Sequence, residues 1–118
     1  MATSKTRTDR IRDLNDKFRR DLVSGGRVFC TAGVNALGPQ FVARALVTVR
    51  SFKAFTPDND PHGTHEFGIF KLTDSESVEQ TCYWKIDYYD LDMAFGSEDP
   101  ADLKRTLRVL TIMLRAEY

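Results

Sequence analysis

The sequence predicts an α+β protein in which a small antiparallel sheet of about three strands carries about three helices packed on one face. Two patterns support this fold class. Residues 80–90, QTCYWKIDYYD, alternate in side-chain character with the two-residue period of a half-buried strand. Residues 8–23 repeat apolar side chains at steps of three and four residues, which is typical of an amphipathic helix. The expected order of elements is α-β-α-β-β-α.

The N-terminal part of the chain is expected to form the first helix. Residues 1–7 are small, polar and basic, and we expect them to be a disordered lead-in to one domain that spans residues 8–118. Thr8 has a side-chain oxygen that suits the cap of this helix. The glycine pair at residues 25–26 is expected to end the helix, because glycine readily adopts the left-handed conformation that follows helices.

A strand and a second helix are expected next. RVFCTA, residues 27–32, has the composition of a short buried strand, and residues 33–38 are expected to form a loop. Pro39 suits the first turn of a helix, because the N–H that proline lacks would have no partner there. This second helix is predicted to span about residues 39–52.

The C-terminal half is expected to contain a hairpin and a last helix. Residues 66–72 and 80–90 have the composition of strands and are joined by a short polar link, which predicts an antiparallel hairpin. Asp99 is the predicted cap of a final helix that runs to about residue 115. The expected core stripe of this helix consists of Leu103, Leu107, Leu110 and Leu114.

The composition is that of a globular protein with its own core. The 118 residues suit one domain, and 42% of them are hydrophobic. No apolar run approaches the ~20 residues that a membrane-spanning helix needs, and the stretch MATSKTRTDR lacks the apolar segment of a secretory signal. We therefore expect a cytoplasmic protein that does not interact with membranes. Cys30 and Cys82 are expected to be reduced, buried thiols.

The charges are unevenly distributed along the chain, although the formal net charge is zero. Residues 1–53 carry 11 Lys and Arg against 4 Asp, and residues 103–118 carry 4 Lys and Arg against 1 Glu. Residues 54–102 carry 12 Asp and Glu against 2 Lys. If these segments occupy separate surfaces, the protein has an acidic side that favours a basic partner. If the fold mixes them, the surface has no such side.

The stretch DNDPHGTHEFG, residues 58–68, holds both histidines of the chain. Its candidate side chains are Asp58, Asp60, His62, His65 and Glu66. One hypothesis is a transition-metal site, in which His62 and His65 are joined by carboxylates such as Asp87. The HxxH spacing is a weak signal, because no cysteine lies near it and no helical HExxH motif is present. The alternative is a polar turn in which Asp and Asn side chains accept hydrogen bonds from backbone amides.

A second group of acidic and aromatic side chains lies at the end of the strand predicted over residues 80–90. It consists of Asp87, Tyr88, Tyr89, Asp90 and Asp92. If the hairpin brings this group beside the 58–68 loop, the two form one acidic patch. Such a patch can bind a basic partner, or act in acid–base chemistry if burial raises the pKa of one carboxyl. The sequence contains no nucleophile motif, and it identifies no catalytic residue, no metal site and no cofactor.

Direct binding to nucleic acid is not expected from the sequence. The basic side chains of the first helix are the only candidate footprint, and Asp9, Asp13, Asp16 and Asp21 are interleaved with them. Charge pairs at steps of three and four residues support a solvated helix and weaken its attraction for phosphates.

Several stretches together resemble a family of small proteins of unknown function from alphaproteobacteria and their plasmids and integrative elements. These stretches are IRDLNDKFRR, GGRVFCTAGV, DNDPHGTHEFG, YWKIDYYD and RVLTIMLRAEY. The resemblance covers nearly the whole chain from about residue 9. It carries over no activity and no catalytic residue, and it implies a small bacterial protein encoded on mobile DNA near anti-restriction and plasmid-maintenance genes.

The leading functional hypothesis is a non-enzymatic protein-binding module of a mobile genetic element that inhibits host defence, such as an anti-CRISPR or anti-restriction protein. Its acidic surface is expected to dock on a basic surface of a nucleic-acid-handling complex. The expected partner-binding residues are Asp58, Asp60, His62, His65, Glu66, Asp87, Tyr88, Tyr89, Asp90 and Asp92. One alternative is a metal-assisted hydrolase or nuclease that uses the His62/His65 loop. Another is a dimerising module, and the sequence leaves the oligomeric state open.

Overall fold

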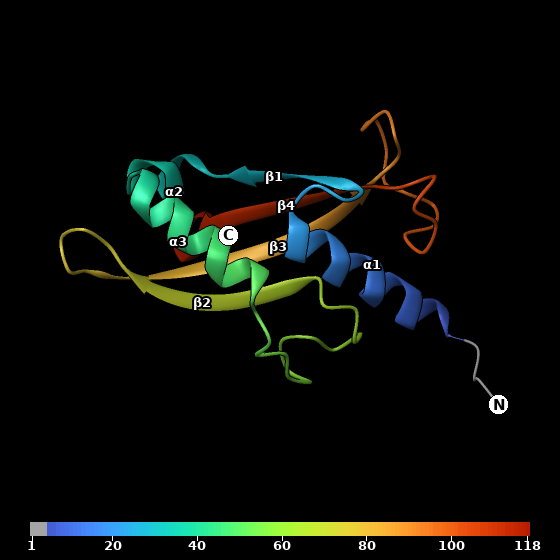
Figure 1. Cartoon of the computed structure of the whole chain (residues 1–118), viewed down its shortest axis with the longest axis horizontal. Helices are drawn as coiled ribbons and strands as arrows, with labels where there is room; N and C mark the ends of the chain where they lie inside the picture. Colours follow the sequence, from blue (N-terminus) through green and yellow to red (C-terminus); the bar gives the residue numbers. More distant parts are fainter. Residues whose placement is uncertain (1–4) are drawn as a thin grey trace.

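A computed structural model describes residues 5–118 of the chain (Figure 1). These residues form three α-helices, four strands and a short 3-10 helix. In chain order the elements are α1 (Arg7–Asp21), β1 (Gly26–Cys30), α2 (Ala32–Ala36), α3 (Pro39–Arg50), β2 (Phe67–Thr73), β3 (Glu79–Tyr89), β4 (Leu107–Leu114) and η1 (Arg115–Glu117). No helix among the described residues has both the length and the apolar composition needed to cross a membrane.

The four strands form one mixed sheet in the order β1-β4-β3-β2. β2 and β3 are antiparallel, as the hairpin prediction required, and their register pairs Phe67 with Lys85 and Thr73 with Glu79. β3 and β4 are also antiparallel, whereas β1 runs parallel to β4. The α+β class is therefore confirmed. The sheet, however, has four strands rather than about three, and it is mixed rather than antiparallel.

The predicted final helix is wrong, because residues 99–106 form turns and β4 occupies residues 107–114. The leucines of LRVLTIML lie three and four residues apart, which mimics a helical stripe. In the sheet, β4 lies between β1 and β3, and side chains on both of its faces are buried, such as Leu110 and Ile112 on one face and Met113 on the other. A central strand of this kind lacks the alternation that marks a half-buried strand.

Asp99 caps a turn rather than a helix. Its carboxylate accepts a hydrogen bond from the Ala101 amide at 3.2 Å, and its backbone oxygen accepts one from the Thr106 hydroxyl at 2.8 Å. Residues 99–106 therefore form the turns that lead into β4.

The N-terminal elements differ from prediction mainly at their ends. Thr6, not Thr8, caps α1, since its hydroxyl oxygen accepts a hydrogen bond from the Asp9 amide at 3.0 Å. Leu22, with a left-handed φ of 62°, follows the last residue of the helix before the glycine pair is reached. Residues 33–38, which were predicted to be a loop, contain most of the short helix α2. Of the predicted lead-in, residues 1–4 lie outside the described residues.

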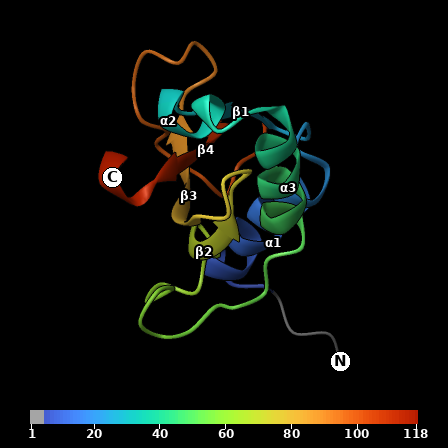
Figure 2. The same cartoon turned by 90° about the vertical axis from the view of Figure 1, so that its left-hand side faces the viewer.

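α1 and α3 lie on the same side of the sheet, as Figure 2 shows. Their buried side chains, among them Phe18 of α1 and Phe41 of α3, pack on Trp84, Ile86 and the other core residues of the strands. Both cysteines are free, and burial raises the pKa of each thiol, that of Cys82 to about 11. Two free thiols, Cys82 buried and Cys30 half-buried, are consistent with the predicted reduced state.

The other side of the sheet carries no α-helix among the described residues. We call it the open face. Its side chains are Arg27 and Phe29 of β1, Phe67, Ile69 and Lys71 of β2, Tyr83, Lys85, Asp87 and Tyr89 of β3, and Val109, Thr111 and Met113 of β4. The C-terminal segment after β4 lies on this side (Figure 2), where the Tyr118 ring packs edge-on against the Tyr83 ring with centroids 5.0 Å apart.

Candidate functional site

A cavity of about 480 Å³ opens at one end of the open face. The cavity lies at the end of the sheet where β2 begins. Phe67, the first residue of β2, pairs with Lys85, and β3 continues past this pair to Tyr89. We call this cavity the acidic groove. The side chains relevant to its chemistry are Asp60, His62, Glu66, Phe67, Lys85, Asp87, Tyr88 and Tyr118.

Three acidic residues from two parts of the chain line the acidic groove. Asp60 comes from the loop before β2, Glu66 immediately precedes β2, and Asp87 lies on β3. Lys85, two residues before Asp87 on the same face, forms an ion pair with Asp87 at 3.1 Å. The groove thus combines three carboxylates with one ammonium group, and its local charge is negative.

Glu66 is held by both its backbone and its side chain. Its carbonyl oxygen accepts a hydrogen bond from the Ile86 amide at 2.8 Å, which extends the β2–β3 ladder by one step. Its Oε2 atom accepts a hydrogen bond from the Tyr88 hydroxyl at 2.7 Å. The carboxylate is therefore fixed at the wall of the groove before any ligand binds.

A buried chain of hydrogen bonds links Glu66 to an arginine on β4. The Tyr88 oxygen accepts a hydrogen bond from Asn15 Nδ2 at 2.7 Å, and Asn15 Oδ1 accepts one from Arg108 Nε at 2.6 Å. Every donor in this chain points from the guanidinium toward the carboxylate. Such aligned hydrogen bonds polarise one another, so the chain ties α1, β3 and β4 to the groove.

Burial shifts the pKa of two groups in this series of hydrogen bonds, Tyr88 and Arg108. The pKa of Tyr88 is raised above its usual range, first because the phenol is buried and second because it donates to Glu66. Burial lowers the pKa of Arg108. The Arg108 guanidinium also donates to the Pro100 carbonyl at 2.6 Å and lies over the Tyr88 ring, while its Nη1 atom has no hydrogen-bond partner among the described residues.

The two histidines have different surroundings. His62 lines the acidic groove, whereas His65 lies against the helices. The Nδ1 atom of His65 is 2.9 Å from Asp16 of α1, its Nε2 atom is 3.7 Å from Asp60, and its ring stacks on Phe55 with centroids 3.7 Å apart. Its φ of 56° is unusual for a residue other than glycine, and these contacts hold it there.

The predicted metal-ligand set is not assembled in the described part of the chain. Within residues 5–118, no three His, Cys, Asp or Glu side chains are arranged so that they could hold a metal ion. His65 is instead engaged by Asp16, a residue that the sequence-based ligand set did not include.

The remaining predicted partner-binding residues are dispersed. Tyr89 lines a neighbouring cavity of about 700 Å³ on the open face, which shares Lys85, Asp87 and Tyr118 with the acidic groove. Asp58 and Asp92 are exposed and line neither cavity. Asp90 holds its own loop by accepting a hydrogen bond from the Ala94 amide at 3.0 Å. The structure therefore brings six of the ten predicted residues together at the two cavities: Asp60, His62, Glu66, Asp87, Tyr88 and Tyr89.

The sequence did not predict the role of Asn15 and Arg108, whose hydrogen bonds connect the core to Tyr88 and Glu66 in the acidic groove. Asn15 and Arg108 are 93 positions apart and meet only because α1 packs against β4. A weak signal was present for each, since Asn15 interrupts the apolar stripe of α1 and Arg108 interrupts the apolar run LRVLTIML. Buried polar side chains in such positions almost always form hydrogen bonds.

The fold and the groove define a small α+β protein with a mixed four-stranded sheet and an acidic groove at one end of its open face. The chain belongs to the family described as "Protein of unknown function (DUF3768)", whose pattern matches residues 30–117. The matched part includes every residue of the acidic groove except Tyr118, while α1 and most of β1 precede it. No curated protein and no solved structure matches the chain.

Proposed function

We propose that the chain is a non-enzymatic protein-binding module that accepts a basic segment of a partner protein in the acidic groove. The observation that carries this proposal is that Asp60, Glu66 and Asp87 all line one cavity. Among the described residues, only Asp87 of these three carboxylates has a Lys or Arg side chain within ion-pair distance. Glu66 is therefore left without an ion-pair partner among the described residues, while Asp60 is engaged by His65, and the free Glu66 carboxylate favours a cationic guest.

The guest that best fits the groove is an arginine side chain. The Phe67 and Tyr118 rings form one wall of the groove, with ring centroids 5.9 Å apart. A guanidinium group stacks on aromatic rings and donates paired hydrogen bonds to a carboxylate, whereas a lysine ammonium does neither equally well. Glu66 offers the carboxylate in a fixed position, because Tyr88 already binds one of its oxygens.

A more specific form of the proposal is that the partner handles nucleic acid. Proteins that bind phosphate backbones present arginine and lysine on their surfaces, and an acidic groove competes for those side chains. On this basis we propose that the protein inhibits a host-defence complex, as anti-restriction and anti-CRISPR proteins of mobile elements do. A phage-restriction assay tests this: production of the protein should raise plaque counts on a restricting host, and the E66Q/D87N variant should not.

The docking proposal is tested by fluorescence anisotropy with a short labelled peptide of alternating Arg and Gly. A matched peptide in which citrulline replaces arginine keeps the shape but removes the charge. We expect the Glu66→Gln and Asp87→Asn substitutions each to weaken binding of the arginine peptide by about tenfold at low salt, which corresponds to about 1.4 kcal/mol.

The matched controls are Asp58→Asn and Asp92→Asn, which remove the same charge from exposed sites outside the groove. These variants should bind the arginine peptide almost as well as the wild type, because exposed single charges have small effects on affinity. Equal losses in all four variants, or equal binding of the citrulline peptide, would show that the groove has no specific role.

A further inference from the structure

A second charged groove lies on the helical side of the molecule, between the C-terminal ends of α1 and α3. Two adjoining cavities of about 220 and 320 Å³ form it, and both are lined by Arg20, Arg50 and Ser51. The smaller cavity is also lined by Lys53 and by the buried Arg19. We call this the basic groove.

The exposed cations of the basic groove have no anionic partners. Arg20, Arg50 and Lys53 are all exposed, and among the described residues none of them has a carboxylate within ion-pair distance. The Arg50 side chain donates a hydrogen bond to the backbone oxygen of Arg20 at 2.9 Å, which holds it against the C-terminal end of α1. The groove therefore presents three free positive charges at its rim.

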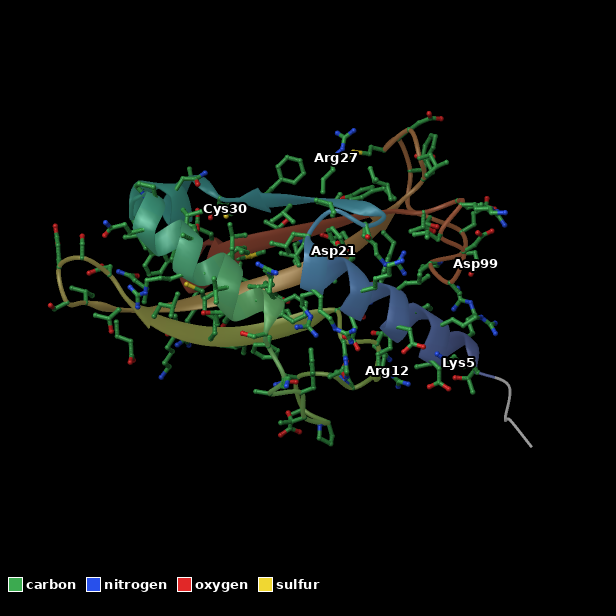
Figure 3. The ribbon with its side chains drawn as sticks, viewed as in Figure 1. Lys5, Arg12, Asp21, Arg27, Cys30 and Asp99 are labelled. Carbon is green, nitrogen blue, oxygen red and sulfur yellow. The ribbon has the colours of Figure 1, made fainter. Side chains whose placement is uncertain are left out.

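Three of the four acidic residues of α1 are engaged away from the groove, whereas Asp16 lines the smaller cavity and is already paired there with Arg19 and His65. Asp9 pairs with Arg12 at 2.7 Å, and Asp13 pairs with Lys5. Asp16 binds Arg19 and His65, and Asp21 accepts hydrogen bonds from the residues that follow α1. Figure 3 shows Lys5 and Arg12 near the N-terminal end of α1 and Asp21 near its C-terminal end.

Arg19 partly offsets the negative partial charge at the C-terminal end of α3, beside the same groove. Its guanidinium is 4% exposed and donates to the carbonyl oxygens of Val49 and Phe52, both at 2.9 Å. These carbonyls would otherwise give the C-terminal end of α3 a partial negative charge. With these two carbonyls bound by Arg19, the C-terminal end of α3 opposes an entering anion less strongly, and Arg20, Arg50 and Lys53 supply positive charge at the rim.

We propose that the basic groove binds the phosphate backbone of single-stranded nucleic acid. Its concave shape and arginine forks suit phosphate groups, and the stacked rings of Phe55 and His65 in its lining offer a surface for a base. Concavity argues against a membrane surface, which is flat on this scale. The sequence-based expectation against nucleic acid considered α1 alone, and the fold adds Arg50 and Lys53 beside Arg20.

The test measures binding of purified protein to a labelled oligothymidine of about 12 nucleotides by fluorescence anisotropy, at salt concentrations from about 50 to 200 mM. The groove variant is R20Q/R50Q/K53Q. The control variant is R27Q/K104Q/R115Q, which removes three exposed charges from other surfaces. Circular dichroism melting confirms that both variants fold, and Arg20→Gln, which removes one exposed charge of the groove, is used if the triple groove variant does not fold.

We expect the groove variant to lose at least about tenfold in affinity and its salt slope to fall by about 2, since three phosphate contacts disappear. The control should lose less than about threefold, and Arg20→Gln alone should lower the salt slope by about 0.7, the change expected for one phosphate contact. Equal losses in groove and control variants, no binding at low salt, or binding to phosphatidylserine vesicles in place of the oligonucleotide would each overturn the proposal. Because no basic peptide takes part, this result is independent of the function proposed for the acidic groove.

Discussion

The hydroxyl of Tyr88 donates a hydrogen bond of 2.7 Å to the carboxylate of Glu66, and the same oxygen accepts one from Asn15. This pair joins the buried interior to the acidic groove. Tyr88 lies on the helical side of β3, where the core is, while Glu66 reaches solvent at the wall of the groove. The position of a candidate binding group therefore depends on packing between α1 and the sheet.

Replacement of Tyr88 by phenylalanine should destabilise the protein. The substitution leaves the Asn15 amide and the Glu66 carboxylate without a shared partner, which costs about 1–2 kcal/mol of unfolding free energy. Urea denaturation measures the change. The control is Tyr89→Phe, whose hydroxyl makes no hydrogen bond among the described residues and which should change the free energy by less than about 0.5 kcal/mol.

Tyr88 should be the tyrosine that resists ionisation in the folded protein. Burial and the bond to Glu66 raise its pKa above the usual value of 10.0, so the folded state keeps the proton that the unfolded state releases. The stabilising effect is complete below pH 10.0 and declines as the pH rises above it. In an alkaline titration followed by phenolate absorbance, the last step should coincide with unfolding and should be absent in Tyr88→Phe.

Loss of the Arg19 side chain should separate α1 from the end of α3. Arg19→Gln removes the two 2.9 Å hydrogen bonds to Val49 and Phe52 and the ion pair with Asp16. We expect a loss of about 2–4 kcal/mol in unfolding free energy, because hydrogen bonds from a buried charged group are the stronger class. Thermal or urea denaturation of Arg20→Gln, the exposed neighbour, should give a change within about 0.5 kcal/mol. Similar losses at both positions would contradict the assignment.

Gly68 should not tolerate a side chain. A methyl group at this position in β2 would lie 2.2 Å from Trp84 Nε1 and 2.8 Å from the Phe52 ring. Gly68→Ala should therefore cost about 1–3 kcal/mol through overpacking, as measured by urea denaturation. Gly96→Ala is the matched control, because the nearest atom to its methyl group would be 3.8 Å away. A neutral effect at Gly68 would show that this part of the core is loosely packed.

Glu117 should make the C-terminal segment sensitive to acid. Its carboxylate accepts hydrogen bonds from the Thr31 hydroxyl at 2.6 Å and from the Leu114 and Gly33 amides, and these contacts lower its pKa below the usual 4.5. The stabilisation is present above pH 4.5 and is lost as the pH falls through the lowered pKa. Unfolding free energies measured between about pH 6 and pH 3 should fall less steeply for Glu117→Gln than for the wild type. Glu76→Gln, whose side chain has no hydrogen bond among the described residues, should keep the wild-type slope.

The hairpin and its faces could be predicted from the sequence because the relevant signals are local. In β2, Phe67 and Ile69 lie on the face opposite Gly68 and Phe70, as the two-residue period of a strand requires. Alternation in β3 likewise separated Asp87 on the open face from the core residue Trp84. These periods are set by the backbone of each strand, so no knowledge of the rest of the fold is needed.

β4 and the support of the acidic groove could not be predicted in this way. A central strand loses the two-residue period when both faces are covered, and the leucine spacing around Leu110 and Leu114 then matched a helix. The meeting of Asn15 with Arg108 depends on how α1 packs on β4. The same is true of Arg20 and Arg50, which come together only at the ends of two packed helices. Long-range packing, not local propensity, sets these contacts.

The most direct test of the docking proposal is an amide chemical-shift map of the isotopically labelled protein during titration with the arginine peptide. We predict that the shifts concentrate at residues 60–67, at 85–88 and at Tyr118, and that the citrulline peptide leaves these amides unchanged. Shifts scattered over the whole acidic surface, including Asp58 and Asp92, or the absence of shifts around Glu66, would contradict the claim that this groove is the binding site.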